Sequence, residues 1–89
     1  MKIRLELFGA SRDFSKKDYL VIEIQEKGSI EDLRNKIIQY LGKNFKGNKS
    51  FIEIVKSSAF CSENNEIISD NYKITKDQKI GIIPPIGGG

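Results

Sequence analysis

The chain has 89 residues, of which 38% are hydrophobic and 30% are charged, so it accommodates one small domain with little room for a deep catalytic pocket. It contains no histidine and a single cysteine, which excludes imidazole metal ligands, a histidine general base and an internal disulfide. Fifteen basic and twelve acidic residues leave a net charge of +3, and the longest basic run is the pair Lys16–Lys17, so we expect neither a metal site nor a nucleic-acid surface.

Two strands are predicted at the start of the chain. Residues 2–8 alternate charged and apolar side chains, which is the period-two pattern of a half-buried strand. Residues 9–17 are polar and turn-like, and residues 19–25 alternate again with Leu20 and Ile22 in phase. Two strands joined by a short connection predict an antiparallel hairpin.

A helix is predicted to follow. Ser29 can cap it by accepting a backbone N–H, and Glu31 and Asp32 suit the positive end of the helix dipole. Gly42 is expected to end the helix. Four apolar side chains recur at helical spacing and define the buried face: Ile30, Leu33, Ile37 and Leu41.

The second half of the chain is predicted to be mostly extended. Residues 43–50 are polar and are expected to form a loop. Residues 51–55 and 58–62 are predicted to be strands, residues 67–68 a brief extended piece, and residues 79–83 the final strand. The order of strand, strand, helix and further strands predicts an α+β domain over residues 1–83, with one main helix across a mixed sheet. The ubiquitin-like β-grasp fold fits this order best.

The carboxyl-terminal residues have an unusual composition. Both prolines and three of the eight glycines fall in six positions: Pro84, Pro85, Ile86, Gly87, Gly88 and Gly89. Prolines cannot donate ladder hydrogen bonds, so they end the last strand and keep the exit of the chain extended. Glycines have minimal width, and six extended residues reach about 20 Å. We therefore expect a flexible arm over residues 84–89 whose terminal carboxylate enters the site of another enzyme.

This ending on a β-grasp pattern resembles the MoaD family, the small subunits of molybdopterin synthase. The resemblance covers essentially the whole chain, and the Pro84–Pro85 pair followed by terminal glycines is its specific part. It implies that a MoeB-type adenylyltransferase uses ATP to adenylate Gly89 and that a sulfurtransferase then replaces AMP with sulfur. The resulting thiocarboxylate would donate its sulfur to cyclic pyranopterin monophosphate within a heterotetramer containing two MoaE-type large subunits. The chain would then be a non-catalytic sulfur donor with no permanently bound cofactor.

A docking face for these partners is predicted from residues that break the strand pattern. Phe8 is out of phase with the apolar residues of the first strand, and Ile83 is out of phase with those of the last. Because these strands are neighbours in a β-grasp sheet, Phe8 and Ile83 are expected to form an apolar patch near the tail, on the sheet face away from the helix. The family resemblance adds Ile67 to this patch.

Other readings of the sequence remain open. Cys61 has no basic neighbour that would stabilise a thiolate, so we expect a buried side chain with no catalytic role. A related carrier could supply sulfur for cysteine, thiamin or a tRNA base, and a ubiquitin-like protein modifier would use the same activation chemistry. No apolar run approaches the roughly 20 residues that span a bilayer. The amino terminus lacks the apolar centre of a signal peptide, so we expect a cytoplasmic protein without a membrane partner.

Overall fold

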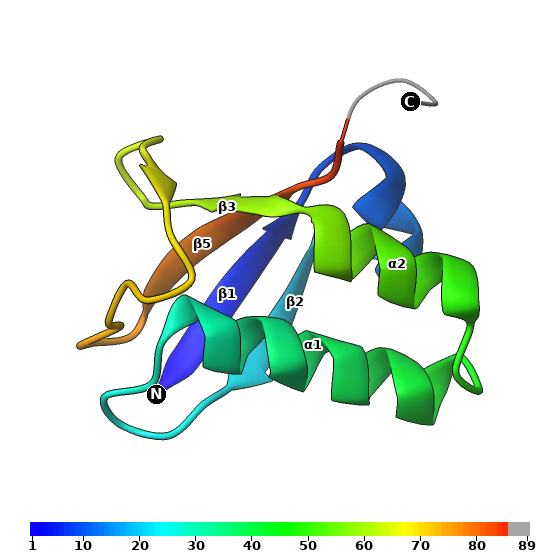
Figure 1. The fold of residues 1–89 in the computed structure, drawn as a ribbon, viewed down its shortest axis with the longest axis horizontal. Coiled ribbons are helices and arrows are strands. Elements are labelled where there is room, and N and C mark those ends of the chain that lie inside the picture. Colours follow the sequence, from blue (N-terminus) through cyan, green and yellow to red (C-terminus); the bar gives the residue numbers. More distant parts are fainter. Residues whose placement is uncertain (86–89) are drawn as a thin grey trace.

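The computed structural model describes residues 1–85 and shows a sheet with two α-helices packed on one face (Figure 1). The helices are α1 (Ile30–Asn44) and α2 (Lys49–Ser57), and a 3₁₀ helix, η1 (Gly9–Phe14), follows the first strand. Within the described residues, five strands pair in the order β2-β1-β5-β3-β4. Their bounds are β1 (Lys2–Leu7), β2 (Tyr19–Glu23), β3 (Ala59–Cys61), β4 (Ile67–Ile68) and β5 (Gln78–Ile83).

The strand pairing makes the sheet mixed. β1 is antiparallel to β2 and parallel to β5, whereas β3 is antiparallel to both β5 and β4. The first and last strands therefore lie side by side at the centre of the sheet, where helices cover their inner face. The predicted α+β class and ubiquitin-like β-grasp fold are confirmed.

α1 begins as predicted. The Ser29 hydroxyl accepts a hydrogen bond from the Asp32 backbone N–H at 3.3 Å, and the Asp32 carboxylate accepts one from the Ser29 N–H at 2.9 Å. The prediction that Gly42 ends the helix is wrong, because the Phe45 N–H still donates to the Leu41 carbonyl at 2.9 Å. Gly42 lies on the exposed side of the last turn, where glycine weakens a helix without breaking it. Within residues 1–85 no helix is long and apolar enough to cross a membrane.

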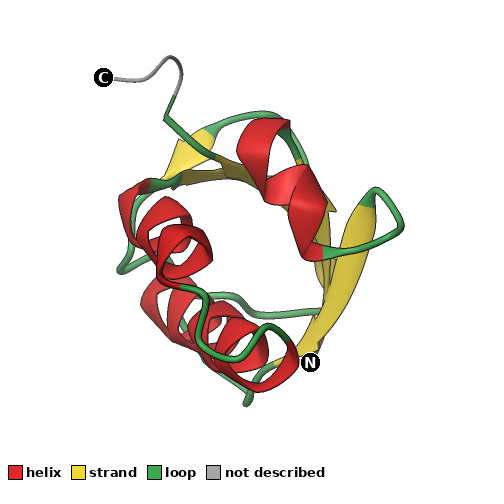
Figure 2. Ribbon diagram, turned by 90° about the vertical axis from the view of Figure 1, so that its right-hand side faces the viewer, coloured by secondary structure: helices red, strands yellow, loops and turns green. Residues whose placement is uncertain are grey.

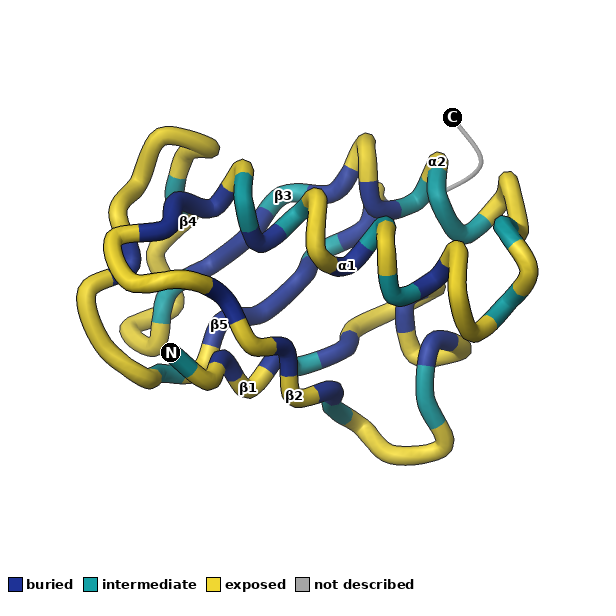
Figure 3. Tube along the Cα trace, turned by 90° about the horizontal axis from the view of Figure 1, so that it is seen from below, coloured by how far each residue is buried: buried dark blue, intermediate teal, exposed yellow. Residues whose placement is uncertain are grey.

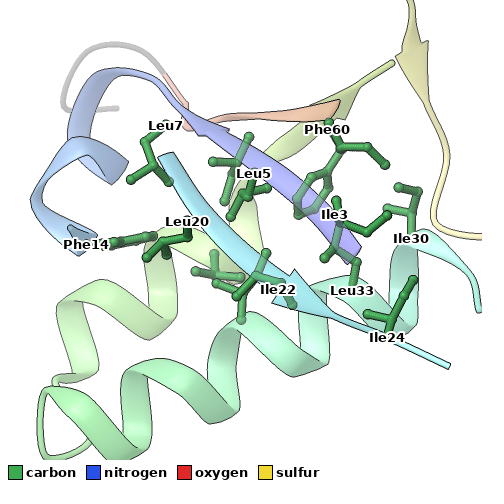
Figure 4. Packing of buried hydrophobic residues seen from close by; sticks show 14 of the residues in the cluster. Ile3, Leu5, Leu7, Phe14, Leu20, Ile22, Ile24, Ile30, Leu33 and Phe60 are labelled. Atoms are coloured by element: carbon green, nitrogen blue, oxygen red, sulfur yellow. The ribbon is translucent and has the colours of Figure 1, made fainter. Parts of the chain in front are cut away.

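The core lies between the sheet and the helices. Figure 2 shows the helices on one side of the sheet, and Figure 3 shows that the buried parts of the chain face this interior. Strand residues of one phase meet the predicted apolar face of α1 there, as the close view of their side chains shows (Figure 4). The fully buried members include Ile3, Leu5, Ile30, Leu33, Ile37, Leu41, Ile80 and Ile82.

The predicted strand over residues 51–55 is wrong, since these residues lie within α2. The Asn48 side chain caps this helix by accepting a hydrogen bond from the Phe51 N–H at 3.1 Å. Phe51 contacts Phe14 of η1 and Phe45, with centroid distances of 5.1 Å in both pairs. Only residues 45–48 lie between α1 and α2, so the connection is shorter than the predicted loop over residues 43–50.

Candidate docking face and tail exit

An apolar row crosses the sheet on the side away from the helices. Phe8 follows β1 and is 51% exposed, Ile67 on β4 is 67% exposed, and Ile83 on β5 is half-buried. The register connects them, because Cys61 on β3 pairs with both Gly81 and Ile67. The structure thus brings the three predicted residues to one face, which we call the docking face: Phe8, Cys61, Ile67, Gly81 and Ile83.

Sequence reasoning missed the centre of this face. Gly81 is buried, and Cys61 is only 9% exposed. Both lie between Phe8 and Ile67, since β5 and β3 separate β1 from β4 in the strand order. The sequence shows that Gly81 points to the face opposite that of Ile80 and Ile82. It does not show which residues of other strands lie beside Gly81, because this depends on how distant strands pair.

The chain leaves the sheet beside Phe8. Pro84 follows β5 and is buried, whereas Pro85 is exposed. A Cβ atom at Gly9 would lie 3.9 Å from Cδ and Cγ of Pro84, so the proline ring is close to the backbone that directly follows Phe8. Gly9 has φ +54°, a conformation that glycine adopts without strain where β1 turns into η1. Figure 1 shows the end of β5 beside this turn.

Of the predicted tail residues, Pro84 is therefore located at the edge of the docking face, and the exposed Pro85 follows it. Ile86, Gly87, Gly88 and Gly89 lie outside the described residues. The expected arm, its terminal carboxylate and the boundary between residues 1–83 and 84–89 remain predictions.

Charged side chains line depressions beside Phe8, and some of them form ion pairs. Arg12 contacts Asp18 at 3.1 Å, and Arg4 contacts Glu6 at 3.3 Å. Two depressions are lined by Phe8, and Glu6 contributes to both. In the part of the chain that the structure describes, no group of three or more Cys, Asp or Glu side chains could hold a metal ion. The described residues thus form a surface with an apolar centre and charged neighbours, adjacent to the exit of the tail.

The comparison with protein families identifies one match. The sequence profile of the ThiS family matches residues 5–89, which is nearly the whole chain. No curated protein sequence matches the chain.

Solved structures share the fold at low sequence identity. SAMP1 from Haloferax volcanii aligns over all of both chains with a TM-score of 0.69 and 13% identity. A Pyrococcus furiosus protein assigned as molybdopterin converting factor subunit 1 aligns with a TM-score of 0.68 and 19% identity, over 96% of this chain and 98% of that one. A third match is a chain in the complex of subunits 1 and 2 of molybdopterin-converting factor from Helicobacter pylori. It aligns over all of both chains, with a TM-score of 0.59 and 22% identity.

Proposed function

The chain belongs to the ThiS family of ubiquitin-like sulfur carriers, and we propose that its sulfur is carried as a thiocarboxylate on the terminal carbonyl of Gly89. In this proposal an adenylyltransferase of the MoeB type joins the Gly89 carboxylate to AMP and releases pyrophosphate. A sulfurtransferase then supplies the sulfur that displaces AMP. Ile86 is followed by Gly87, Gly88 and Gly89. These three glycines have no side chains, so the end of the chain is thin enough to enter the sites of both enzymes.

One observation carries this proposal: the exit of the tail lies at the edge of an exposed apolar face. The buried Pro84 fixes where the chain leaves the sheet, and Phe8 lies one residue before the glycine that Pro84 approaches. A partner could therefore bind Phe8, Ile67 and Ile83 on the domain while the last five residues extend toward its active site. Five extended residues reach about 17 Å. Docking and delivery of the tail would thus occur on the same side of the molecule.

The acceptor of the sulfur is proposed to be cyclic pyranopterin monophosphate. The chain would then be the small subunit of molybdopterin synthase, in a heterotetramer with two MoaE-type large subunits. The fold shared with subunit 1 of molybdopterin converting factor, and with the Helicobacter pylori two-subunit complex, supports this choice. The large subunit would bind the pterin and handle its protons, because the depressions beside Phe8 in the described residues are open to solvent.

Intact-mass spectrometry of the protein from its native host tests the chemistry directly. Replacement of one carboxylate oxygen by sulfur adds about 16 Da, and tandem fragmentation must locate this addition on Gly89 as the last residue of the mature chain. Conjugates on lysines of other proteins, without the added sulfur, would instead assign the chain to the protein modifiers. Recovery of a mature chain that continues past Gly89 and carries no sulfur would reject the proposal.

A reconstitution assay identifies the acceptor. The thiocarboxylate form is mixed with the MoaE-type subunit of the same organism and cyclic pyranopterin monophosphate, and molybdopterin is measured as product. Two carriers should be consumed for each molybdopterin, because the product contains two sulfurs. A thiocarboxylate form that yields no product here, but thiolates a tRNA or a precursor of cysteine or thiamin, would move the chain to another carrier pathway.

A further inference from the structure

Gly81 occupies the centre of the docking face on β5, a strand paired on both sides. It lies opposite Glu6 on β1 and opposite Cys61 on β3. A Cβ atom built at this position would lie 2.7 Å from Cys61 Sγ and 2.9 Å from Phe8 Cε2. Both distances are far below van der Waals contact, so the thiol and the aromatic ring already occupy the space that a side chain would need.

The backbone of Gly81 does not require glycine. Among the described glycines, positive φ angles occur at Gly9 and Gly47 but not at Gly81. Glycine inside a strand is also intrinsically unfavourable, because it loses more conformational entropy than other residues and packs no side chain. Glycine at position 81 is therefore explained by the space above it, which the Cys61 thiol and the Phe8 ring both occupy.

The backbone of Phe8 is held separately by Ser11. The Ser11 hydroxyl accepts a hydrogen bond from the Phe8 N–H at 3.0 Å and donates one to the Phe8 carbonyl at 2.6 Å. Ser11 is itself fully buried. With the Phe8 backbone held at both polar groups, a side chain at position 81 would displace the ring by rotating it outward about its own torsions.

The same corner of the fold holds the exit of the tail. Gly9 follows Phe8 and lies against Pro84, which is three residues beyond Gly81 on the same segment. The distance from the Phe8 ring to the start of the tail is thus set by contacts made at both ends of the segment 81–84. A ring that rotates outward changes this distance, while the tail keeps its exit.

We propose that Gly81 is a positioning residue for docking: its missing side chain seats the Phe8 ring against Cys61, at the depth that a partner needs in order to receive the tail. This inference rests on the proposed function, in which the docking face binds the adenylyltransferase. It predicts that the partner's contact surface is apolar and shaped to a seated ring. Gly81 itself touches neither the tail nor ATP.

The test replaces Gly81→Ala in the full-length chain. The seating of the ring is measured without a partner, by nuclear Overhauser effects between the Phe8 ring protons and the protons of residue 81 and Cys61. Docking is measured with the MoeB-type adenylyltransferase of the same organism, by ATP–pyrophosphate exchange at varied carrier concentration. Gly42→Ala is the matched control, because within residues 1–85 a Cβ at that exposed position would meet no atom within 4 Å apart from its chain neighbours and the local helix backbone.

We expect Gly81→Ala to weaken the Phe8–Cys61 effects and to raise the KM for the carrier about tenfold, with kcat changed less than about twofold. Phe8→Ala should raise KM similarly, and Gly81→Ala added to Phe8→Ala should raise it no further, because both changes remove the same seated ring. Gly42→Ala should leave KM and kcat unchanged. Thermal unfolding of each variant checks that the fold persists.

Two outcomes would overturn the inference and are distinguishable from failure of the proposed function. If the wild-type chain supports exchange but Gly81→Ala behaves like Gly42→Ala, the positioning role is wrong and the proposed function stands. If Gly81→Ala raises KM by the same factor in the wild-type and Phe8→Ala backgrounds, it acts through a contact other than the Phe8 ring. The positioning role of Gly81 is then also wrong. If the wild-type chain supports no exchange, the proposed function fails and the inference fails with it.

Discussion

Arg34 and Asp70 form a two-point ion pair between α1 and the segment that follows β4. Nη2 of Arg34 lies 2.6 Å from Oδ1 of Asp70, and Nε lies 3.2 Å from Oδ2. Nη1 donates to the carbonyls of Val55 at 2.6 Å and Ser58 at 2.8 Å, at the end of α2. The guanidinium also lies 4.9 Å from the ring centroid of Phe60. Arg34 therefore joins four segments of the chain through a side chain that is only 15% exposed.

Replacing this arginine should destabilise the fold. Arg34→Ala removes the donors of several carbonyls and the partner of Asp70, so we expect the free energy of unfolding to fall by about 2–3 kcal/mol. Arg34→Lys keeps the charge but cannot make the planar two-point contact, so it should lose about 1–2 kcal/mol. Urea unfolding measures both.

Arg12 provides the matched control for Arg34. Its ion pair with Asp18 joins side chains that are 62% and 82% exposed, so Arg12→Ala should change stability by no more than about 0.5 kcal/mol. Equal losses for Arg12→Ala and Arg34→Ala would contradict the joining role of Arg34.

The cap of α2 can be tested independently. Asn48→Ala removes the acceptor for the Phe51 N–H and should lower the free energy of unfolding by about 1 kcal/mol. Asn48→Asp retains an oxygen acceptor and should be close to wild type. Urea unfolding distinguishes the two variants, and an equal loss for both would mean that the side-chain cap does not stabilise α2.

The role of the docking face predicts different effects for two exposed apolar residues. Phe8 and Val21 are exposed to similar extents, 51% and 58%, but Val21 lies on the edge strand β2, which β1 separates from β5. Phe8→Ala should weaken binding of the adenylyltransferase or the MoaE-type subunit at least about tenfold, or about 1.4 kcal/mol. Val21→Ala should leave binding unchanged. Calorimetric titration measures the affinities, and equal loss for both variants would reject a localised face.

Deletion of the last residue should abolish adenylation without lowering the stability of the fold. Deletion of Gly89 removes the carboxylate that the adenylyltransferase positions, so adenylation should fall to background in the ATP–pyrophosphate exchange assay. The temperature of unfolding should stay at the wild-type value, because the buried core lies within residues 3–82. Substantial adenylation of the shortened chain would show that Gly89 is not the reacting residue.

Several elements could be predicted from the sequence because their patterns are local. The alternation in residues 2–8 and 19–25 located β1 and β2, and the spacing of Ile30, Leu33 and Ile37 located α1. The phase break at Phe8 correctly placed its side chain on the outer face of the sheet. These inferences succeed because one buried face imposes a single period on each segment.

The same reasoning gave a wrong prediction for residues 51–55, which are helical. Phe51, Ile54 and Val55 fit a helical face, but their aromatic and β-branched side chains also suit a strand. The Asn48 cap and the contact between Phe51 and Phe14 favour the helix. Phe14 is distant in sequence, so no local pattern could reveal this contact.

The sequence by itself determined the alternating strands, the first helix and the unusual composition of residues 84–89, because each depends on neighbours a few positions apart. Only the tertiary structure decided that Phe8 lies over Gly81 and beside Cys61, and that Pro84 lies against Gly9. These contacts depend on the parallel pairing of β1 with β5 and the antiparallel pairing of β5 with β3. Such registers arise from packing the whole core, which joins residues more than fifty positions apart.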